Sequence, residues 1–186
     1  MTLYVYVDNS NIWIEGQRVQ AVRQGLAPDI RTAVRDRILA PWAYDFGRLY
    51  ELACPPNEQI GRSILYGSRP PDNDSIWQRA RDAEFQVEVF DRSIYTNKEK
   101  QVDIALSTTM LENSFNHMRA DNGDIAVLVA GDGDFLPTIR SLQKRAFGIR
   151  VVSWTHAVSR ELRDTADEFV GLDPHFGYLT YRGRAA

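Results

Sequence analysis

Acidic side chains follow two apolar segments of the chain, at the point where each segment ends. Asp8 comes directly after the run LYVYV, and Asp132 and Asp134 follow the run DIAVLVA. A further acid, Asp103, stands among apolar neighbours in the segment KQVDIAL. Carboxylates that gather away from water repel one another and take up protons unless a cation neutralises them. Since oxygen ligands without Cys or His favour a hard ion, the pattern predicts a Mg²⁺ or Mn²⁺ site.

Such a site points to phosphoryl chemistry. A magnesium ion held by few carboxylates keeps water ligands, and one of these waters can attack a phosphodiester. Each acid also has a purely structural interpretation: Asp134 as a helix N-cap, Asp103 as an acid favoured by the dipole of the first helical turn, and Asp8 as part of an Asx turn. The coincidence of all four aspartates at predicted strand ends and helix starts favours the metal site over four separate structural roles.

The apolar runs and the periodic segments between them predict alternating strands and helices. The predicted strands cover 3–7, 62–67, 87–91, 124–130 and 149–154, and the predicted helices cover 29–39, 46–54, 74–84, 101–118, 135–145 and 159–168. The segment 12–24 permits a loop and then an amphipathic helix. Apolar strands that alternate with helices predict a mainly parallel sheet covered on both faces. Right-handed crossovers then give a Rossmann-like, three-layer α/β/α sandwich. Ligands of such folds bind beyond the carboxyl ends of the strands, where Asp8 and Asp132 are expected.

The composition fits one compact domain. The chain has 186 residues, of which 44% are hydrophobic and 25% charged, and its net charge of −3 argues against a protein that coats polyanions. We expect a single domain over 1–173, with a helical insertion at about 25–45 and a loosely docked C-terminal extension over 174–186. The single cysteine, Cys54, excludes internal disulfides. With no membrane-length apolar run and no signal-peptide pattern at the N-terminus, we expect a cytoplasmic protein without a membrane partner.

Three segments resemble, in order and spacing, the NYN-domain proteins, which are PIN-like nuclease relatives of the LabA/DUF88 group. The segments are VDNSNIW, KQVDIALSTTML and VLVAGDGDFLPTIRSLQKRAFGIRVVSW. The resemblance spans residues 3–16 and 98–173, about half of the chain, and it implies a PIN-like sheet. It departs from the family pattern at Ala130, where serine or threonine is common, and at Gln101, where glycine is common. Neither departure removes a carboxylate.

The resemblance implies a metal-dependent ribonuclease. Carried over to this chain, it makes Asp8, Asp103, Asp132 and Asp134 the catalytic acids and the ligands of Mg²⁺ or Mn²⁺. Asn11 becomes their polar, substrate-binding companion. The implied substrate is RNA, single-stranded or structured.

Basic and aromatic residues near the expected site could contact that RNA. Lys98 and Lys100 precede the helix start that carries Asp103, and we predict Lys100 as a substrate-binding residue, with exposed surface charge as the alternative. Tyr95, Trp13 and Trp154 could stack unpaired bases. Core packing is favoured for Trp154 because it ends an apolar strand. His156 has no evident partner in the sequence and is left out of the predicted site.

Three functions are compatible with these residues. The first is the Mg²⁺- or Mn²⁺-dependent ribonuclease. The second is a noncatalytic RNA-binding or regulatory module that retains the acidic cleft. The third is a different phosphoryl enzyme, but a phosphatase of the haloacid dehalogenase type would need an aspartate where Ser10 stands, and a receiver domain would need paired acids after the first strand. The oligomeric state, including a homo-oligomer, stays open.

Overall fold

The computed structural model describes residues 1–69, 74–91 and 100–183. Within these ranges the chain forms a six-stranded sheet of order β3-β2-β1-β4-β5-β6, in which every neighbouring pair is parallel. The strands are β1 (Thr2–Asp8), β2 (Gln59–Arg69), β3 (Gln86–Asp91), β4 (Ile125–Val129), β5 (Gly148–Ser153) and β6 (Glu168–Gly171). This is the doubly wound strand order, with its topological switch between β1 and β4.

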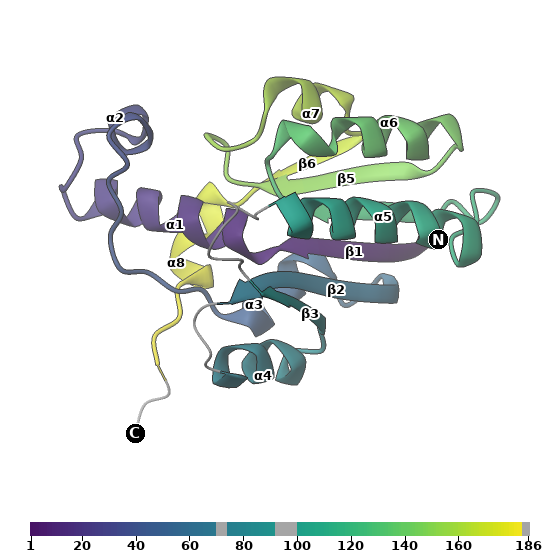
Figure 1. The fold of residues 1–186 in the computed structure, drawn as a ribbon, viewed down its shortest axis with the longest axis horizontal. Helices are drawn as coiled ribbons and strands as arrows, with labels where there is room; N and C mark the ends of the chain where they lie inside the picture. Colours follow the sequence, from purple (N-terminus) through teal and green to yellow (C-terminus); the bar gives the residue numbers. More distant parts are fainter. Residues whose placement is uncertain (70–73, 92–99, 184–186) are drawn as a thin grey trace.

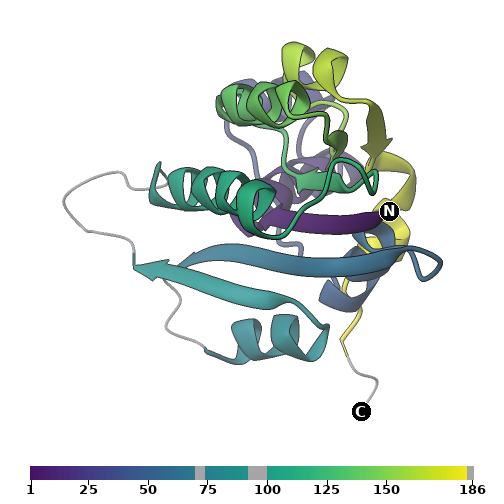
Figure 2. The same cartoon turned by 90° about the vertical axis from the view of Figure 1, so that its right-hand side faces the viewer.

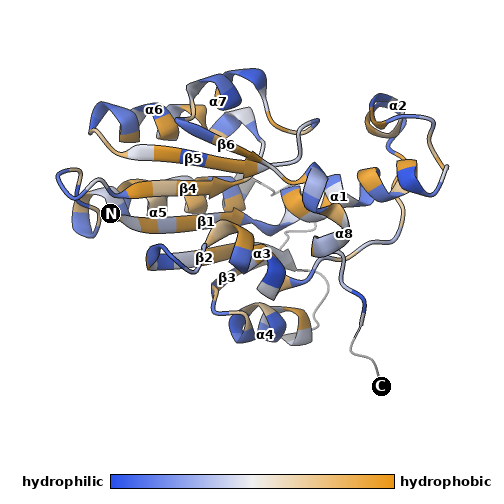
Figure 3. Cartoon of the chain, turned by 180° about the vertical axis from the view of Figure 1, so that it is seen from behind, coloured by the Kyte–Doolittle hydropathy of each residue, from blue (hydrophilic) through white to orange (hydrophobic). Residues whose placement is uncertain are grey.

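Helices cover both faces of the sheet, so the predicted three-layer α/β/α sandwich is confirmed (Figure 1, Figure 2). Four helices pack on the face of the sheet that is toward the viewer in Figure 3. They are α1 (Asn9–Arg23), α3 (Phe46–Ala53), α4 (Asp74–Asp82) and α8 (Phe176–Leu179). Three belong to the core on the other face: α5 (Lys100–Asn116), α6 (Leu136–Lys144) and α7 (Arg160–Thr165). Two short 3₁₀ turns, η1 (Gly133–Phe135) and η2 (Asp173–His175), precede α6 and α8.

Strand β1 is the centre of the core, and all seven of its residues are buried. Its side chains alternate between the two faces: Leu3, Val5 and Val7 pack in one hydrophobic cluster, and Tyr4 and Tyr6 pack in the other. Because helices cover both faces, the strand is continuously apolar from Leu3 to Val7 instead of alternating with polar residues. This burial explains why the N-terminal apolar run predicts a strand so clearly.

The last strand, β6, differs from the prediction of a helix over 159–168. Helix α7 ends at Thr165, and the chain then runs parallel to β5. The Asp167 carboxylate accepts a hydrogen bond from the Ile149 backbone N–H at 2.8 Å, which fixes the start of this edge strand. A strand of four residues is too short to show an alternating pattern, so pairing with β5 decides its conformation.

The prediction of a loosely docked tail after Asp173 is wrong for the described residues that follow it. Phe176 and Leu179 of α8 are buried in the same cluster as Trp42. The Phe176 ring stacks on the Trp42 ring with centroids 5.4 Å apart, and the Trp42 indole N–H donates to the Thr180 hydroxyl at 2.9 Å. Aromatic packing therefore holds this segment against the sheet.

Helix α2 (Ile30–Arg35), which falls inside the predicted insertion, packs beside α1 and stands apart from the strands (Figure 1). Among the residues described, no helix is long and apolar enough to cross a membrane.

Candidate active site

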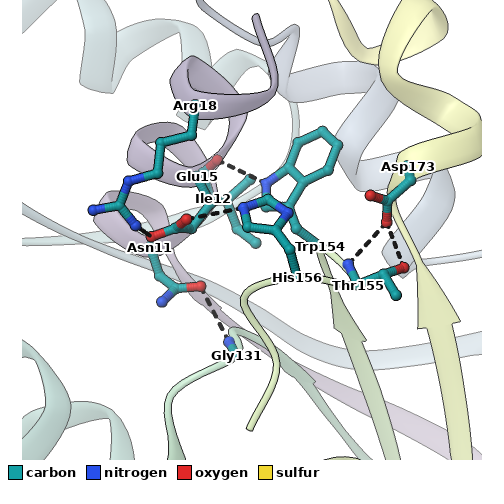
Figure 4. Close-up of polar contacts among 9 residues, drawn as sticks. All are labelled: Asn11, Ile12, Glu15, Arg18, Gly131, Trp154, Thr155, His156 and Asp173. Atoms are coloured by element: carbon teal, nitrogen blue, oxygen red, sulfur yellow. Dashed lines mark hydrogen bonds and ion pairs between the residues drawn. The ribbon is translucent and has the colours of Figure 1, made fainter. Parts of the chain in front are cut away.

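The ends of β1 and β4 carry the predicted acids to one edge of the sheet. The two strands are parallel neighbours, with Val7 opposite Val129, so Asp8 and the loop from residue 130 to Asp132 leave the sheet side by side. The side-chain oxygen Oδ1 of Asn11 accepts a hydrogen bond from the Gly131 backbone N–H at 3.1 Å and ties this loop to α1 (Figure 4). Asp8 and Asp132 therefore lie at the carboxyl ends of parallel strands, as predicted, and the two strands are neighbours in the sheet.

Both strand-end aspartates also cap the helical turns that follow them. Asp8 accepts a hydrogen bond from the Asn11 backbone N–H at 3.1 Å, and Asp132 accepts one from the Asp134 backbone N–H at 2.9 Å. The alternative that Asp134 caps the helix over 135–145 is therefore wrong. A 3₁₀ turn begins directly after Asp132, which takes the capping role, and α6 itself has no side-chain cap.

Three of the four predicted acids line one pocket of about 200 Å³. Asp8, from β1, is only 7% exposed, Asp103 is half-buried, and Asp132 is exposed at the rim. The other lining residues are Ser10, Asn11, Ile14, Glu15, Arg18 and Val102. The structure thus brings Asp8, Asp103, Asp132 and Asn11 together. Asp134 is exposed and does not line this pocket.

Asp103 reaches the pocket because α5 begins near the carboxyl edge of the sheet. It lies in the first turn of that helix, as predicted, and the buried side chains of Val102 and Leu106 beside it anchor the helix on the core. Lys100 is the first residue of α5, and its side chain is not described. Tyr95 and Lys98, which the sequence also suggests for RNA contact, lie outside the described residues.

The donor set of the pocket suits a hard cation, since the described residues that line it offer carboxylate and hydroxyl oxygens and include no Cys or His. Within the described ranges, no three Asp, Glu, His or Cys side chains gather closely enough to hold a metal ion by themselves. An ion would therefore be held by one or two carboxylates and by water, which is the coordination that Mg²⁺ commonly has in proteins. The residues present fit Mg²⁺ or Mn²⁺ in this manner.

Two pocket residues, Glu15 and Arg18, are absent from the sequence-based site. The Glu15 carboxylate forms an ion pair with Arg18 and a contact of 3.0 Å with the His156 ring nitrogen Nε2 (Figure 4). The spacing of Asn11, Glu15 and Arg18 places them on one face of a helix, which was the available signal. His156 does have a partner, contrary to expectation, but that partner lies 141 residues away in the chain.

The environment of Glu15 should make the stability of the protein depend on pH. Burial raises the pKa of its carboxyl group, but the His156 hydrogen bond and the Arg18 charge outweigh burial and hold the pKa below its usual 4.5. Because the folded protein lowers this pKa, ionised Glu15 stabilises the fold above the unfolded-state pKa, and the contribution disappears as pH falls through the folded-state value. We expect Glu15→Gln to be less stable than wild type near neutral pH, with a difference that shrinks on acidification. Urea unfolding of both proteins, from neutral pH down to pH values below the usual carboxyl pKa of 4.5, measures this difference in the free energy of unfolding. A difference that does not change with pH would contradict the prediction.

The two glycines of the GDGD motif should respond differently to alanine. A Cβ on Gly131 would lie 2.6 Å from the Ala157 carbonyl oxygen and 2.7 Å from the Ser153 hydroxyl, whereas one on Gly133 would lie 3.2 Å from its nearest neighbour, the Ser159 hydroxyl. Since the first clash involves backbone, we expect Gly131→Ala to cost about 1–3 kcal/mol and Gly133→Ala clearly less. Thermal melting of the two variants tests this prediction. Equal melting temperatures would show that the backbone around Gly131 can shift to accept the Cβ without loss of stability.

The tryptophans near the site divide into a core residue and a surface residue. Trp154 is fully buried, and its indole N–H donates to the Ile12 carbonyl at 3.0 Å, so core packing is confirmed and base stacking is excluded for it (Figure 4). Trp13 is 41% exposed, although its indole N–H donates to the Trp42 carbonyl at 2.8 Å. Of these two rings, only that of Trp13 is accessible from solvent.

A parallel doubly wound sheet, with an acid-lined pocket beside its β1/β4 switch point, defines the chain as an α/β protein of the PIN-like class. The model of the NYN domain matches residues 3–173, and the chain therefore belongs to the NYN domain family, a family of PIN-like nucleases. Nucleases of this family typically use a divalent metal ion, and their substrates are nucleic acids.

The fold is also similar to a solved structure. A protein of unknown function from Vibrio parahaemolyticus is 18% identical in sequence, with a TM-score of 0.68, and the match covers 97% of this chain and 96% of the other. At this identity the likeness concerns the fold alone. No curated protein matches the chain.

Proposed function

We propose that the protein is a Mg²⁺- or Mn²⁺-dependent ribonuclease that hydrolyses phosphodiester bonds in the pocket beside β1. The observation that carries the proposal is the convergence of Asp8, Asp103 and Asp132 on one small pocket, from three segments far apart in the chain. Membership of a PIN-like nuclease family supports the class of reaction and argues against the phosphatase and receiver alternatives.

Each pocket residue has a role that follows from its setting. When bound, the divalent ion supplies a polarised water as the nucleophile and offsets the charge on the phosphate. Asp8 is buried and held by the Asn11 backbone N–H, so its carboxylate has a defined orientation for a ligand. Asp103 and Asp132 face the same pocket from α5 and from the β4 loop. A metal ion there would relieve the repulsion among the three carboxylates.

Asn11 is suited to contact the substrate. Its side-chain carbonyl oxygen is used by the Gly131 backbone N–H, so the group that it can offer is its NH₂ donor, which suits a phosphate oxygen. Lys100 remains a proposed phosphate contact at the start of α5. Asp134 remains a proposed fourth acid.

The direct experiment incubates the purified protein with end-labelled single-stranded RNA, and in parallel with DNA of the same sequence, in Mg²⁺, Mn²⁺ or EDTA. We expect shortened RNA with either metal and intact RNA in EDTA. Cleavage that persists in EDTA would contradict the role of the metal. Intact RNA under every metal condition would contradict the ribonuclease.

A noncatalytic RNA-binding module is the second candidate. It is favoured by the position of Asp134, which does not line the pocket and leaves three of the four predicted aspartates there. Retention of RNA by the wild-type protein, without cleavage under any metal, would support this alternative.

A further inference from the structure

The pocket has a cationic end as well as an acidic one. Asn11, Glu15 and Arg18 line it from one face of α1, and the rise of 1.5 Å per residue places Arg18 roughly 10 Å further along the helix axis than Asn11. Helical side chains tilt toward the N-terminus, so the long Arg18 side chain reaches back toward the aspartates. Figure 4 shows its guanidinium group on the side of α1 where Asn11 lies.

The hydrogen bonding of Arg18 is incomplete. Its side chain is 21% exposed, and its Nε–H is enclosed without an acceptor. A guanidinium group has five N–H donors, and in the part of the chain that the structure describes only Glu15 accepts from it. Because an enclosed donor without a partner costs free energy, a ligand that supplies acceptors would complete the hydrogen bonding of Arg18.

The ion pair holds the guanidinium group in place. One carboxylate oxygen of Glu15 accepts from Arg18, and the other contacts Nε2 of His156. Since both oxygens are engaged, the carboxylate has a fixed orientation, and it in turn fixes one edge of the guanidinium group. Glu15 and His156 are therefore positioning residues for Arg18, which itself lines the pocket.

The chemistry of the pocket identifies the ligand. A guanidinium fork matches the oxygens of a phosphate group, and it retains its charge at every physiological pH. The described residues that line the pocket include no aromatic ring, so they offer contacts to a nucleic acid backbone and no surface for base stacking. A pocket of about 200 Å³ has room for a phosphate with its neighbouring atoms and no room for a duplex.

We propose that Arg18 binds a backbone phosphate that flanks the scissile phosphate of a single-stranded nucleic acid, independently of base sequence. The inference rests on the proposed ribonuclease, because it takes the aspartates as the place of the scissile phosphate. It adds a substrate-binding residue and a path for the bound nucleic acid, which runs from the acids along α1 toward Arg18.

The test measures binding without cleavage. Anisotropy of a short fluorescent single-stranded RNA is recorded in Ca²⁺, which uses the same oxygen ligands as Mg²⁺ with looser geometry. We expect Arg18→Met to raise Kd about tenfold at low salt, the effect of losing one charged hydrogen-bonding group. The slope of log K against log salt should fall by about 0.7, the value for one phosphate contact on a single strand. Arg18→Lys should keep the slope and bind less tightly than wild type, because it retains the charge and loses the fork.

The matched control is Arg119→Met, which removes an exposed arginine between α5 and β4, at the opposite edge of the sheet. Its Kd and salt slope should equal those of wild type. If Arg18→Met does not fold, as judged by its melting curve, Arg18→Gln replaces it in the same measurement.

An unchanged Kd and slope in the Arg18 variant would overturn the inference, as would a wild type that binds no RNA. A wild type that binds RNA through Arg18 and cleaves none with Mg²⁺ or Mn²⁺ would end the ribonuclease proposal and leave this one intact. If the wild type cleaves RNA and Arg18→Met cleaves it with the same KM, the ribonuclease proposal stands and the inference about Arg18 fails.

Discussion

Replacement of Asp8 or Asp132 by asparagine is expected to lower the rate of RNA cleavage by more than about 100-fold. Mutation of residues that only hydrogen-bond to a metal ligand already lowers metal affinity or activity by about 10- to 100-fold. Each change removes one carboxylate from the acid-lined pocket and keeps the shape of the side chain. The loss should appear in single-turnover cleavage with Mg²⁺ or Mn²⁺. Calorimetric titration with Mn²⁺ should show weaker binding in the Asp8→Asn, Asp132→Asn double variant.

Asparagine is the informative replacement because both aspartates are N-caps. Asparagine caps a helix about as well as aspartate, so the hydrogen bonds from the backbone N–H groups of Asn11 and Asp134 can persist. Neutralising one of several neighbouring carboxylates also removes repulsion in the absence of metal. We therefore expect a melting temperature equal to or above that of wild type. A lost activity with a retained fold separates the metal-binding role from the structural one.

Two comparisons sharpen this prediction. Asp134→Asn should lose less activity, because its exposed side chain does not line the pocket, and a loss as large as that of Asp8→Asn would instead place Asp134 among the metal ligands. Asp121→Asn, an exposed acid in the connection between α5 and β4, should cleave at the wild-type rate. If Asp8→Asn and Asp132→Asn both cut RNA at the wild-type, metal-stimulated rate, this pocket is not the active site.

The largest stability effect is expected at Trp154. Its fully buried ring packs edge-on against Trp42, with centroids 5.8 Å apart, and lies 6.0 Å from the Phe176 ring. Trp154→Ala removes these contacts, leaves a cavity and removes the indole N–H that donates to the Ile12 carbonyl. We expect a cost of about 3–5 kcal/mol in the free energy of unfolding. For a chain of this size, that corresponds to a fall in melting temperature of roughly 6–20 °C.

Denaturant and thermal unfolding measure this loss, and Trp13→Ala is the matched control. Trp13 also donates an indole hydrogen bond, to the Trp42 carbonyl, but its ring is partly exposed, so its removal should cost clearly less. Trp154→Phe should fall between wild type and Trp154→Ala, because it keeps most of the packing and loses the hydrogen bond. Equal losses for Trp13→Ala and Trp154→Ala would show that burial does not govern the effect.

Much of the fold could be predicted from local patterns. The apolar runs at β1 and β4 are buried on both faces, so their composition alone distinguishes them from the amphipathic helices. Once these strands are parallel and central, the residues that follow them must meet at one edge of the sheet. The proximity of Asp8 and Asp132, and the position of Asp103 at a helix start, could therefore be expected before any coordinates.

The tail and the edge strand could not be predicted in this way. Residues 168–171 form a strand because β5 offers free backbone groups beside them, and α8 is buried because Trp42 and Trp154 present aromatic surface to it. Neither cause is local. A short segment with weak intrinsic preference takes the conformation that its neighbours in space can satisfy.

Hydrophobic periodicity and chain order were enough to predict the alternation of elements, the parallel sheet and the edge where the acids collect. Packing in three dimensions set which further side chains join the acids at that edge. It assigned the capping role to Asp132 instead of Asp134, paired Glu15 with His156 and turned Arg18 into the pocket. These contacts join residues that are far apart in the chain: the Glu15–His156 contact spans 141 positions and depends on how α1 lies against the end of β5, and no local pattern encodes that packing.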